Sequence, residues 1–331
     1  MNLLRNHSQH LSPLQSLDSR LPQNPQPAEP ANAASKTGGI ILAAISSLTF
    51  GFVPFFSVTL MDAGFSPFEV LAYRWGVATL VLLAVGLLMR KSFRVPKGAW
   101  LPLLTVSFFC ALTAISLLIA YENIASGVAS TIHFMYPLFV AAVMMTVFHE
   151  PRSWVKIGAI ILSLVGAGFL AGGDIRLEDG NVTAGILWAA LSVIAYGTYI
   201  VGVRKTAVQN MPTLPLTVYV MGFGAVSFTL LGMLSGGVRW VPLSDGFLWA
   251  NILGIALLGT AVSNITLVAA IKRIGPTLSA ILGALEPLTA VVIGVLALSE
   301  AFTLRTAAGI ILIIIAVTAV VLSEGRHEKK E

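Results

Sequence analysis

The sequence is poor in charged residues. Of its 331 residues, only 11% are Asp, Glu, Lys or Arg, whereas 56% are hydrophobic. A soluble globular protein carries about 25% charged residues, because its surface must be solvated by water. Together with a mean hydropathy of +0.87, this scarcity of charge excludes a soluble protein and indicates that lipid surrounds most of the chain.

Cysteine and the common catalytic motifs are also scarce or missing. The single cysteine, Cys110, lies in an apolar run, so no internal disulfide can form. The sequence has no Gly-x4-Gly-Lys-Ser/Thr motif, which argues against direct use of ATP by this chain. His149 and Glu150 lack the second histidine of a zinc-binding helix, and no Ser, His and Asp cluster at one depth as in a membrane protease. We therefore expect no catalytic residue, no metal site, no cofactor and no enzyme.

The sequence does contain a series of long apolar runs. About 20 apolar helical residues cross a hydrocarbon core of about 30 Å, and ten runs of suitable length follow one another, joined by short loops. They cover residues 38–60, 67–89, 99–119, 123–147, 154–172, 183–202, 214–236, 247–269, 276–298 and 304–322. The sequence therefore predicts an all-α integral membrane protein with ten transmembrane helices and no inserted soluble domain.

The two ends differ in composition from these runs. Residues 1–37 are rich in Gln, Pro, Asn and Ser and contain too little apolar surface to fold. No apolar signal-peptide core follows Arg5. We expect residues 1–37 to form a disordered cytoplasmic tail and residues 323–331 to form a charged cytoplasmic tail.

The basic residues indicate an orientation. If the N-terminus lies inside, sixteen of the 20 Lys and Arg residues fall in inner segments and three in outer loops, as the positive-inside rule requires. The outer three are Arg176, Arg239 and Arg305. The excess of cations therefore indicates an N-in, C-in multi-pass protein of the plasma membrane, expected to be a bacterial inner membrane, and it does not indicate nucleic-acid binding.

The chain contains an internal duplication. Residues 39–51 align with residues 185–197 at an offset of 146, with six identities in thirteen positions. Further along, Pro137-Leu138 matches Pro287-Leu288 at an offset of 150. The two copies span residues 38–173 and 183–322. Each copy contains five helices, and because five is odd the second copy must enter the membrane from the opposite side. Inverted repeats of this kind are typical of secondary transporters.

These features resemble the EamA-type transporters of the drug/metabolite transporter superfamily. The resemblance rests on Arg74 in the second helix and on a proline followed by an acidic helix end in the fourth and ninth helices, Pro137 to Glu150 and Pro287 to Glu300. It implies that one ten-helix chain can hold a complete transport pathway. The family includes exporters of amino acids, metabolites and drugs as well as nucleotide-sugar carriers, so the resemblance leaves the solute open.

Two charged residues lie at membrane depth. Arg74 is about 10 Å below the outer face, and Glu286 is near the midplane, about 15 Å from the inner face. Charges in this position are costly unless they are paired or hydrated, and they often mark a functional site. We interpret Glu286 as the residue that binds a substrate ammonium group or a proton, with Arg74 as its modulator or as an anion site. A structural ion pair between the two is the alternative interpretation.

Polar and aromatic residues on three other helices extend this candidate site. His133 and Tyr136 lie on a wide face of the fourth helix, and Trp188 and Tyr196 lie on one side of the sixth helix. Asn264 lies mid-membrane in the eighth helix. We expect these residues to line a cavity for an organic solute. The alternatives are a hydrogen-bonded interior histidine, packing or interfacial anchoring for the aromatic residues, and a helix–helix hydrogen bond for the asparagine.

Two prolines at matching positions are expected to act as hinges. Pro137 and Pro287 each remove one backbone hydrogen bond from their helix.

Together these features predict a secondary transporter that exports a small organic metabolite, either an amino acid or a drug-like solute, by alternating access. An integral-membrane enzyme acting on lipid-linked substrates and a passive channel remain alternatives. The expected partners are the small-molecule solute and the lipid bilayer, with protons as a further option. The sequence leaves open whether the protein is a monomer or a homodimer.

Overall fold

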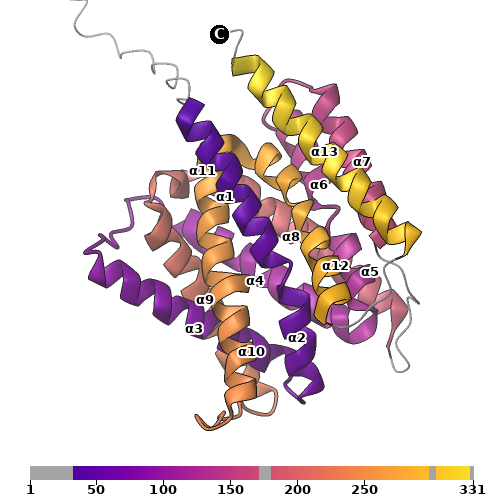
Figure 1. The fold of residues 1–331 in the computed structure, drawn as a ribbon. Coiled ribbons are helices and arrows are strands. Elements are labelled where there is room, and N and C mark those ends of the chain that lie inside the picture. Colours follow the sequence, from indigo (N-terminus) through magenta and orange to yellow (C-terminus); the bar gives the residue numbers. More distant parts are fainter. Residues whose placement is uncertain (1–32, 171–179, 298–302, 329–331) are drawn as a thin grey trace, which may run out of the picture. The chain divides into compact units, whose positions relative to one another are not determined.

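A computed structural model describes residues 33–170, 180–297 and 303–328. Within these ranges all regular elements are helical, and Figure 1 shows how they pack. The elements of the first half are α1 (Ala33–Phe50), α2 (Val53–Asp62), α3 (Pro67–Leu88), α4 (Trp100–Asn123), α5 (Ser126–His133), α6 (Tyr136–Thr146) and α7 (Trp154–Leu170). Those of the second half are α8 (Val182–Lys205), η2 (Ala207–Asn210), α9 (Thr213–Leu234), α10 (Gly246–Ala256), η3 (Leu257–Val262), α11 (Ser263–Leu282), α12 (Leu285–Ala297) and α13 (Leu304–Glu328).

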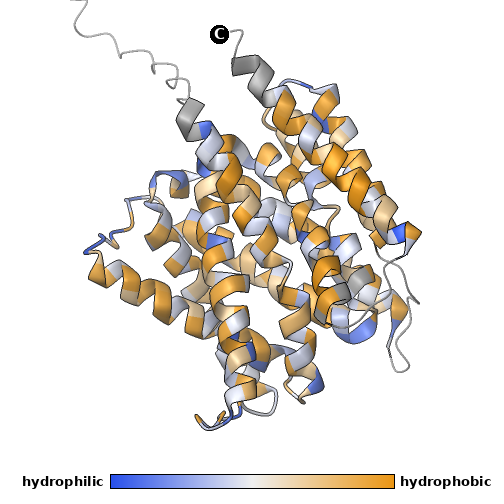
Figure 2. Ribbon diagram, in the orientation of Figure 1, coloured by the Kyte–Doolittle hydropathy of each residue, from blue (hydrophilic) through white to orange (hydrophobic). Residues whose placement is uncertain are grey.

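The composition of these helices is that of a membrane protein. In the described part of the chain, eight helical segments are long and apolar enough to cross a membrane, and α7 is a shorter apolar helix. Hydrophobic residues run along the helices, whereas hydrophilic residues gather mainly at helix ends and in loops (Figure 2). The predicted all-α membrane architecture is confirmed, and the count of ten helices stays a prediction.

Three of the predicted runs are interrupted shortly before a proline. The interruptions fall at residues 51–52, 134–135 and 283–284, ahead of Pro54, Pro137 and Pro287. A proline has no N–H to donate and its ring clashes with the preceding turn, so a helix tends to end just before it. The two prolines expected to be hinges therefore lie in the first turns of α6 and α12, immediately after these breaks.

Helices also extend into both predicted tails. α1 begins at Ala33, within the stretch 1–37, and α13 continues through Glu328, within the stretch 323–331. The last proline before α1 is Pro30, and no proline follows in either extension, so nothing in the backbone stops the helix at the last apolar residue. The remainder of both tails lies outside the described residues.

The two halves pack through helix pairs that follow the internal repeat. α1 lies along α11, and its repeat-mate α8 lies along α4, whose counterpart in the second half runs from α10 into the first part of α11, before the kink at Gly275. α3 lies along α9, and α7 lies along α13 (Figure 1). Each of these pairs joins one half of the chain to the other. The halves are therefore interleaved, and neither forms a separate bundle.

Glycines at matching positions make two of these contacts close. A Cβ atom on Gly39 would lie 2.5 Å from Cγ2 of Ile274, and one on Gly185 would lie 2.7 Å from Cγ2 of Ile124. Ile124 and Ile274 are separated by the repeat offset of 150. The first helix of each half therefore packs on the same surface of the opposite half, which is the relation expected of inverted repeats.

Candidate functional site

A small cavity of about 60 Å³ lies between residues of both halves. Five of the seven residues expected at a binding site line its walls, namely Arg74, His133, Tyr196, Asn264 and Glu286. The two other expected residues, Tyr136 and Trp188, are not among the lining residues. The structure thus brings together residues from five separate helices of the sequence.

Tyr136 lies directly behind this wall. Its ring centroid is 4.7 Å from that of Tyr196 and 5.5 Å from that of His133. Its hydroxyl lies against the backbone of Gly283, where a Cβ atom would come within 1.7 Å of the Tyr136 oxygen. Trp188 is partly buried and lies eight residues before Tyr196 on α8, which is about 12 Å along the helix axis. Tyr136 therefore supports the cavity wall, and Trp188 lies at some distance from it.

The guanidinium group of Arg74 is held by the other half of the chain. Arg74 is 6% exposed. Its Nε donates a hydrogen bond to Oγ1 of Thr260 at 2.6 Å, and its Nη2 donates to the carbonyl of Gly259 at 3.1 Å. Both acceptors belong to η3, a π-helical segment of the eighth predicted helix. A π turn displaces the usual helical hydrogen bonds and is common at functional sites, and here it supplies the acceptors for a buried cation.

Glu286 shares the cavity with Arg74 but is not bonded to it. Among the described residues, no ion pair or hydrogen bond joins the two side chains. Glu286 lies in the first turn of α12, where the helix dipole favours a negative charge. A guanidinium has five N–H donors, so Arg74 can hold its acceptors on η3 and still donate into the cavity. The direct ion pair, one of the two interpretations of the sequence, is therefore not formed in this conformation.

His133 is fixed by a hydrogen bond across the two halves. Its Nδ1 lies 2.8 Å from Oγ of Ser192, and the same hydroxyl donates to the carbonyl of Ala189 at 2.6 Å. A serine hydroxyl has only one proton to donate, and that of Ser192 goes to the carbonyl of Ala189. Nδ1 of His133 must therefore carry a hydrogen and donate it to Oγ of Ser192. In the neutral ring this leaves Nε2 as a hydrogen-bond acceptor for the cavity.

Asn264 both lines the cavity and stabilises its own helix. Its Nδ2 donates to the carbonyl of Thr260 at 2.9 Å, directly after the π-helical segment. This hydrogen bond stays within one helix. Through Nδ2, Asn264 therefore does not form the helix–helix hydrogen bond that was its alternative interpretation. Its amide instead secures the segment that holds Arg74.

Several residues of the site are not predicted from the sequence, and they include three polar residues. Tyr121 and Cys110 line the cavity, and Thr260 holds Arg74. Tyr121 falls beyond the predicted run 99–119 because α4 continues to Asn123. Thr260 lies four residues before Asn264, on the same helical face, so this spacing is a signal that could have identified it.

The cavity is too small for a metabolite in this conformation. A volume of about 60 Å³ holds only a few water molecules, because one water occupies about 30 Å³ of liquid. Sites for small organic ligands measure about 300–1,000 Å³. In the described conformation the cavity would therefore have to widen before a metabolite could bind there.

Comparisons with known proteins agree with this fold. The model of the EamA-like transporter family matches residues 37–172 and 183–322. A Synechocystis protein described as an uncharacterized transporter is 25% identical over 201 residues, which are 59% of this chain and 59% of that relative. A solved crystal structure matches 88% of this chain and 99% of its own with a TM-score of 0.74 at 17% identity, which is a likeness of fold.

Replacing Thr260 tests how Arg74 is held. In Thr260→Val the Arg74 Nε loses its acceptor while it stays buried, and we expect a loss of about 1–3 kcal/mol of stability, the usual effect of an unsatisfied buried polar group. Thr260→Ser keeps the hydroxyl and should unfold close to the wild-type temperature. Thermal unfolding of the purified proteins in detergent measures both, and equal midpoints for the valine variant and the wild type would contradict the assignment.

Proposed function

The chain belongs to the EamA-like transporter family, and we propose that it is a secondary transporter that moves a small organic metabolite through the central cavity by alternating access. The observation that carries this proposal is the small cavity between the two halves, with Arg74 and Glu286 both on its walls. A passive channel would need an open polar path through the membrane. An enzyme acting on lipid-linked substrates would need its reactive groups within reach of a membrane surface.

The walls of the cavity favour a solute that is both polar and apolar. Glu286 offers a carboxylate to an ammonium group or a proton, and Arg74 offers donors to an anionic group. His133 presents an acceptor, and Tyr196 supplies an aromatic wall. An amino acid or a drug-like compound has this combination of groups. Export of such a solute, driven by a solute or proton gradient, is the direction that we propose.

The proposed topology places both ends of the described chain inside the cell. α1 begins and α13 ends on the same side of the helix bundle (Figure 1), as an even number of crossings requires. The two repeats, residues 38–173 and 183–322, would then exchange conformations in a plasma membrane, within a monomer or a homodimer. The helix breaks before Pro137 and Pro287 are the proposed hinges.

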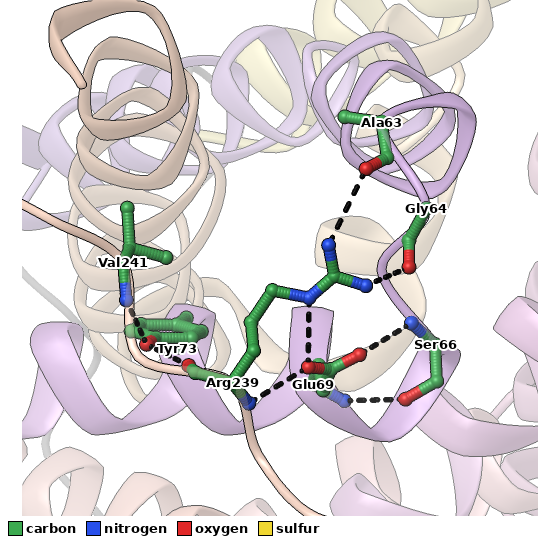
Figure 3. Close-up of polar contacts among 7 residues, drawn as sticks. All are labelled: Ala63, Gly64, Ser66, Glu69, Tyr73, Arg239 and Val241. Carbon is green, nitrogen blue, oxygen red and sulfur yellow. Dashed lines mark hydrogen bonds and ion pairs between the residues drawn. The ribbon is translucent and has the colours of Figure 1, made fainter.

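A polar cluster joins the halves at the predicted outer face (Figure 3). Oε1 of Glu69 accepts hydrogen bonds from the backbone N of Arg239 at 2.9 Å and from its Nε at 3.1 Å. Arg239 also donates to the carbonyls of Ala63 and Gly64. Oε2 of Glu69 accepts from the backbone N of Ser66 at 2.9 Å. This outer latch, formed by Glu69 and Arg239, ties the loop after α2 to the loop after α9.

A tyrosine contact beside the outer latch is repeated at the opposite face. The hydroxyl of Tyr73 donates to the carbonyl of Arg239 at 2.5 Å, and that of Tyr219 donates to the carbonyl of Phe93 at 2.6 Å. Both pairs are related by the repeat offset of 146, so the backbone contact is symmetric. The mate of Arg239 is the uncharged Phe93, so this position supplies no cation for an equivalent ion pair at the opposite face. We infer that the outer latch favours the conformation that is closed to the outside.

The charge of Glu286 should be essential for transport. After a metabolite-resistance screen has identified a solute, counterflow into proteoliposomes should be saturable. Glu286→Gln should reduce counterflow about tenfold or more, since a hydrogen bond to a charged group contributes about 1.5–3 kcal/mol. Glu122→Gln, which removes an exposed carboxylate at the end of α4, is the matched control and should transport normally.

Three outcomes would contradict this account of Glu286. Flux that does not saturate would indicate a channel, and product formation without flux would indicate an enzyme. Unchanged transport and unchanged pH dependence in Glu286→Gln would show that this carboxylate has no part in the process.

Breaking the outer latch should open the cavity to the outside. Cys110, the single cysteine of the chain, lines the cavity, so it can report access by a membrane-impermeant thiol reagent. A partly exposed ion pair contributes up to about 1 kcal/mol, so Arg239→Gln should raise the labelling rate from outside by about fivefold. Arg305→Gln removes a cation from another predicted outer loop and serves as the control. Labelling that is unchanged, or that rises equally from both sides, would exclude the latch.

A further inference from the structure

A second cavity lies on the outside of the helix bundle, apart from the central one. It is a groove of about 380 Å³ among α4, α6 and α8, and it shares no lining residue with the central cavity. Its walls are almost entirely apolar and include Val106, Phe109, Phe139, Val143 and Val201. Two of the three helices come from the first half and one from the second, so the groove follows a contact between the halves.

The open side of this groove faces the hydrocarbon of the membrane. All three helices belong to segments apolar enough to cross a bilayer, and Leu104 and Phe108 beside the groove are 49% and 52% exposed. The walls also contain three threonines, and each hydroxyl donates to a carbonyl of its own helix. These residues are Thr105, Thr198 and Thr206. Water in the groove would therefore find few hydrogen-bond partners, whereas a hydrocarbon chain needs no hydrogen bonds there.

The groove has the length of one bilayer leaflet. Along α4 it runs from Leu101 to Phe109, a rise of about 12 Å, compared with about 15 Å for half of the hydrocarbon core. Trp100 begins α4 and is 56% exposed, as is usual for tryptophan at the level of the lipid headgroups. The groove therefore begins at the headgroup region and ends near the middle of the membrane.

A cation lies at the headgroup end of the groove. Lys205, the last residue of α8, lines the groove, and its Nζ lies 4.9 Å from the ring centroid of Phe148. His149 has a positive φ of 53°, and this sharp turn directs the chain away just after Phe148. In the described part of the chain, Lys205 forms no ion pair. Basic residues in pockets between transmembrane helices are typical binding sites for anionic lipid headgroups.

We propose that this groove binds one acyl chain of an anionic phospholipid, with the lipid phosphate on the ammonium group of Lys205. The repeat-mate of Lys205 is Thr59, so the corresponding place at the opposite face has no cation. The lipid is thus recognised from one leaflet only, the leaflet at the predicted inner face. This proposal is independent of the transported solute.

The bound chain lies directly behind the central cavity. Phe139 lines the groove and packs on Gly197, where a Cβ atom would come within 2.3 Å of Cδ1 of Phe139. Gly197 follows Tyr196, which lines the central cavity. The acyl chain therefore stabilises the contact between α6 and α8 from the side opposite the solute.

Native mass spectrometry of the purified full chain tests the lipid site. Phosphatidylglycerol and phosphatidylcholine with the same acyl chains are added separately, and bound adducts are counted. We expect the wild type to prefer phosphatidylglycerol and Lys205→Gln to lower its binding by about fivefold. Lys205→Arg should restore the preference, and Lys91→Gln, which removes a cation from a loop of the same predicted face outside the groove, should leave it unchanged.

A second variant tests the acyl chain separately from the headgroup. Thr105→Phe fills the groove and should reduce binding of both lipids. Thr229→Phe is its control, because Thr229 lies on α9 and its hydroxyl likewise bonds to its own helix. Equal binding of the two lipids to the wild type, or equal effects of the Lys205 and Lys91 variants, would overturn the headgroup contact. Equal effects of the Thr105 and Thr229 variants would overturn the groove as the binding site.

Discussion

The burial of Arg74 between the two halves is the constraint on which the rest of the site depends. A guanidinium in a membrane interior must have acceptors for its N–H groups, because water is not available to solvate it. The protein meets this need with Thr260 and Gly259 of the opposite half, on a helix that departs from α geometry at that point. Because Arg74 donates to these uncharged acceptors, no ion pair joins it to Glu286 among the described residues, and the Glu286 carboxyl lines the cavity.

The backbone of the two halves is symmetric, whereas the charges are not. Matching contacts include the hydroxyl of Tyr73, which donates to the carbonyl of Arg239, and that of Tyr219, which donates to the carbonyl of Phe93. In the proposed mechanism, such equivalent contacts would let the halves exchange conformations at little difference in free energy. The mates of Arg74 and Glu286 are Val220 and Tyr136, so each of these two charged residues occurs in only one half. In the proposed function, symmetry supports the movement, and the asymmetric residues determine what is bound and which face is closed.

The sequence predicts the membrane class, the helical fold and part of the cavity wall, because each depends on a pattern that one chain displays. Apolar length identifies the spans, and the rarity of charge at membrane depth directs attention to Arg74 and Glu286. It does not predict which groups meet across the halves. Whether Arg74 binds Glu286 or Thr260 depends on the local π turn, and no residue type specifies such a turn. Tyr121 is missed because a helix can continue past its last apolar residue.

The central claim is that the two faces of the bundle open in opposite directions around one cavity. Double electron–electron resonance tests it directly, with Cys110 replaced by Ala and spin labels at exposed positions. One pair, Asp62 and Ser244, spans the halves at the predicted outer face, and the other, Ser92 and Asn210, spans them at the predicted inner face. The account predicts two distance populations for each pair, with the outer distance lengthening as the inner one shortens when solute is added. A single unchanging distance at both faces, or lengthening at both together, would contradict it.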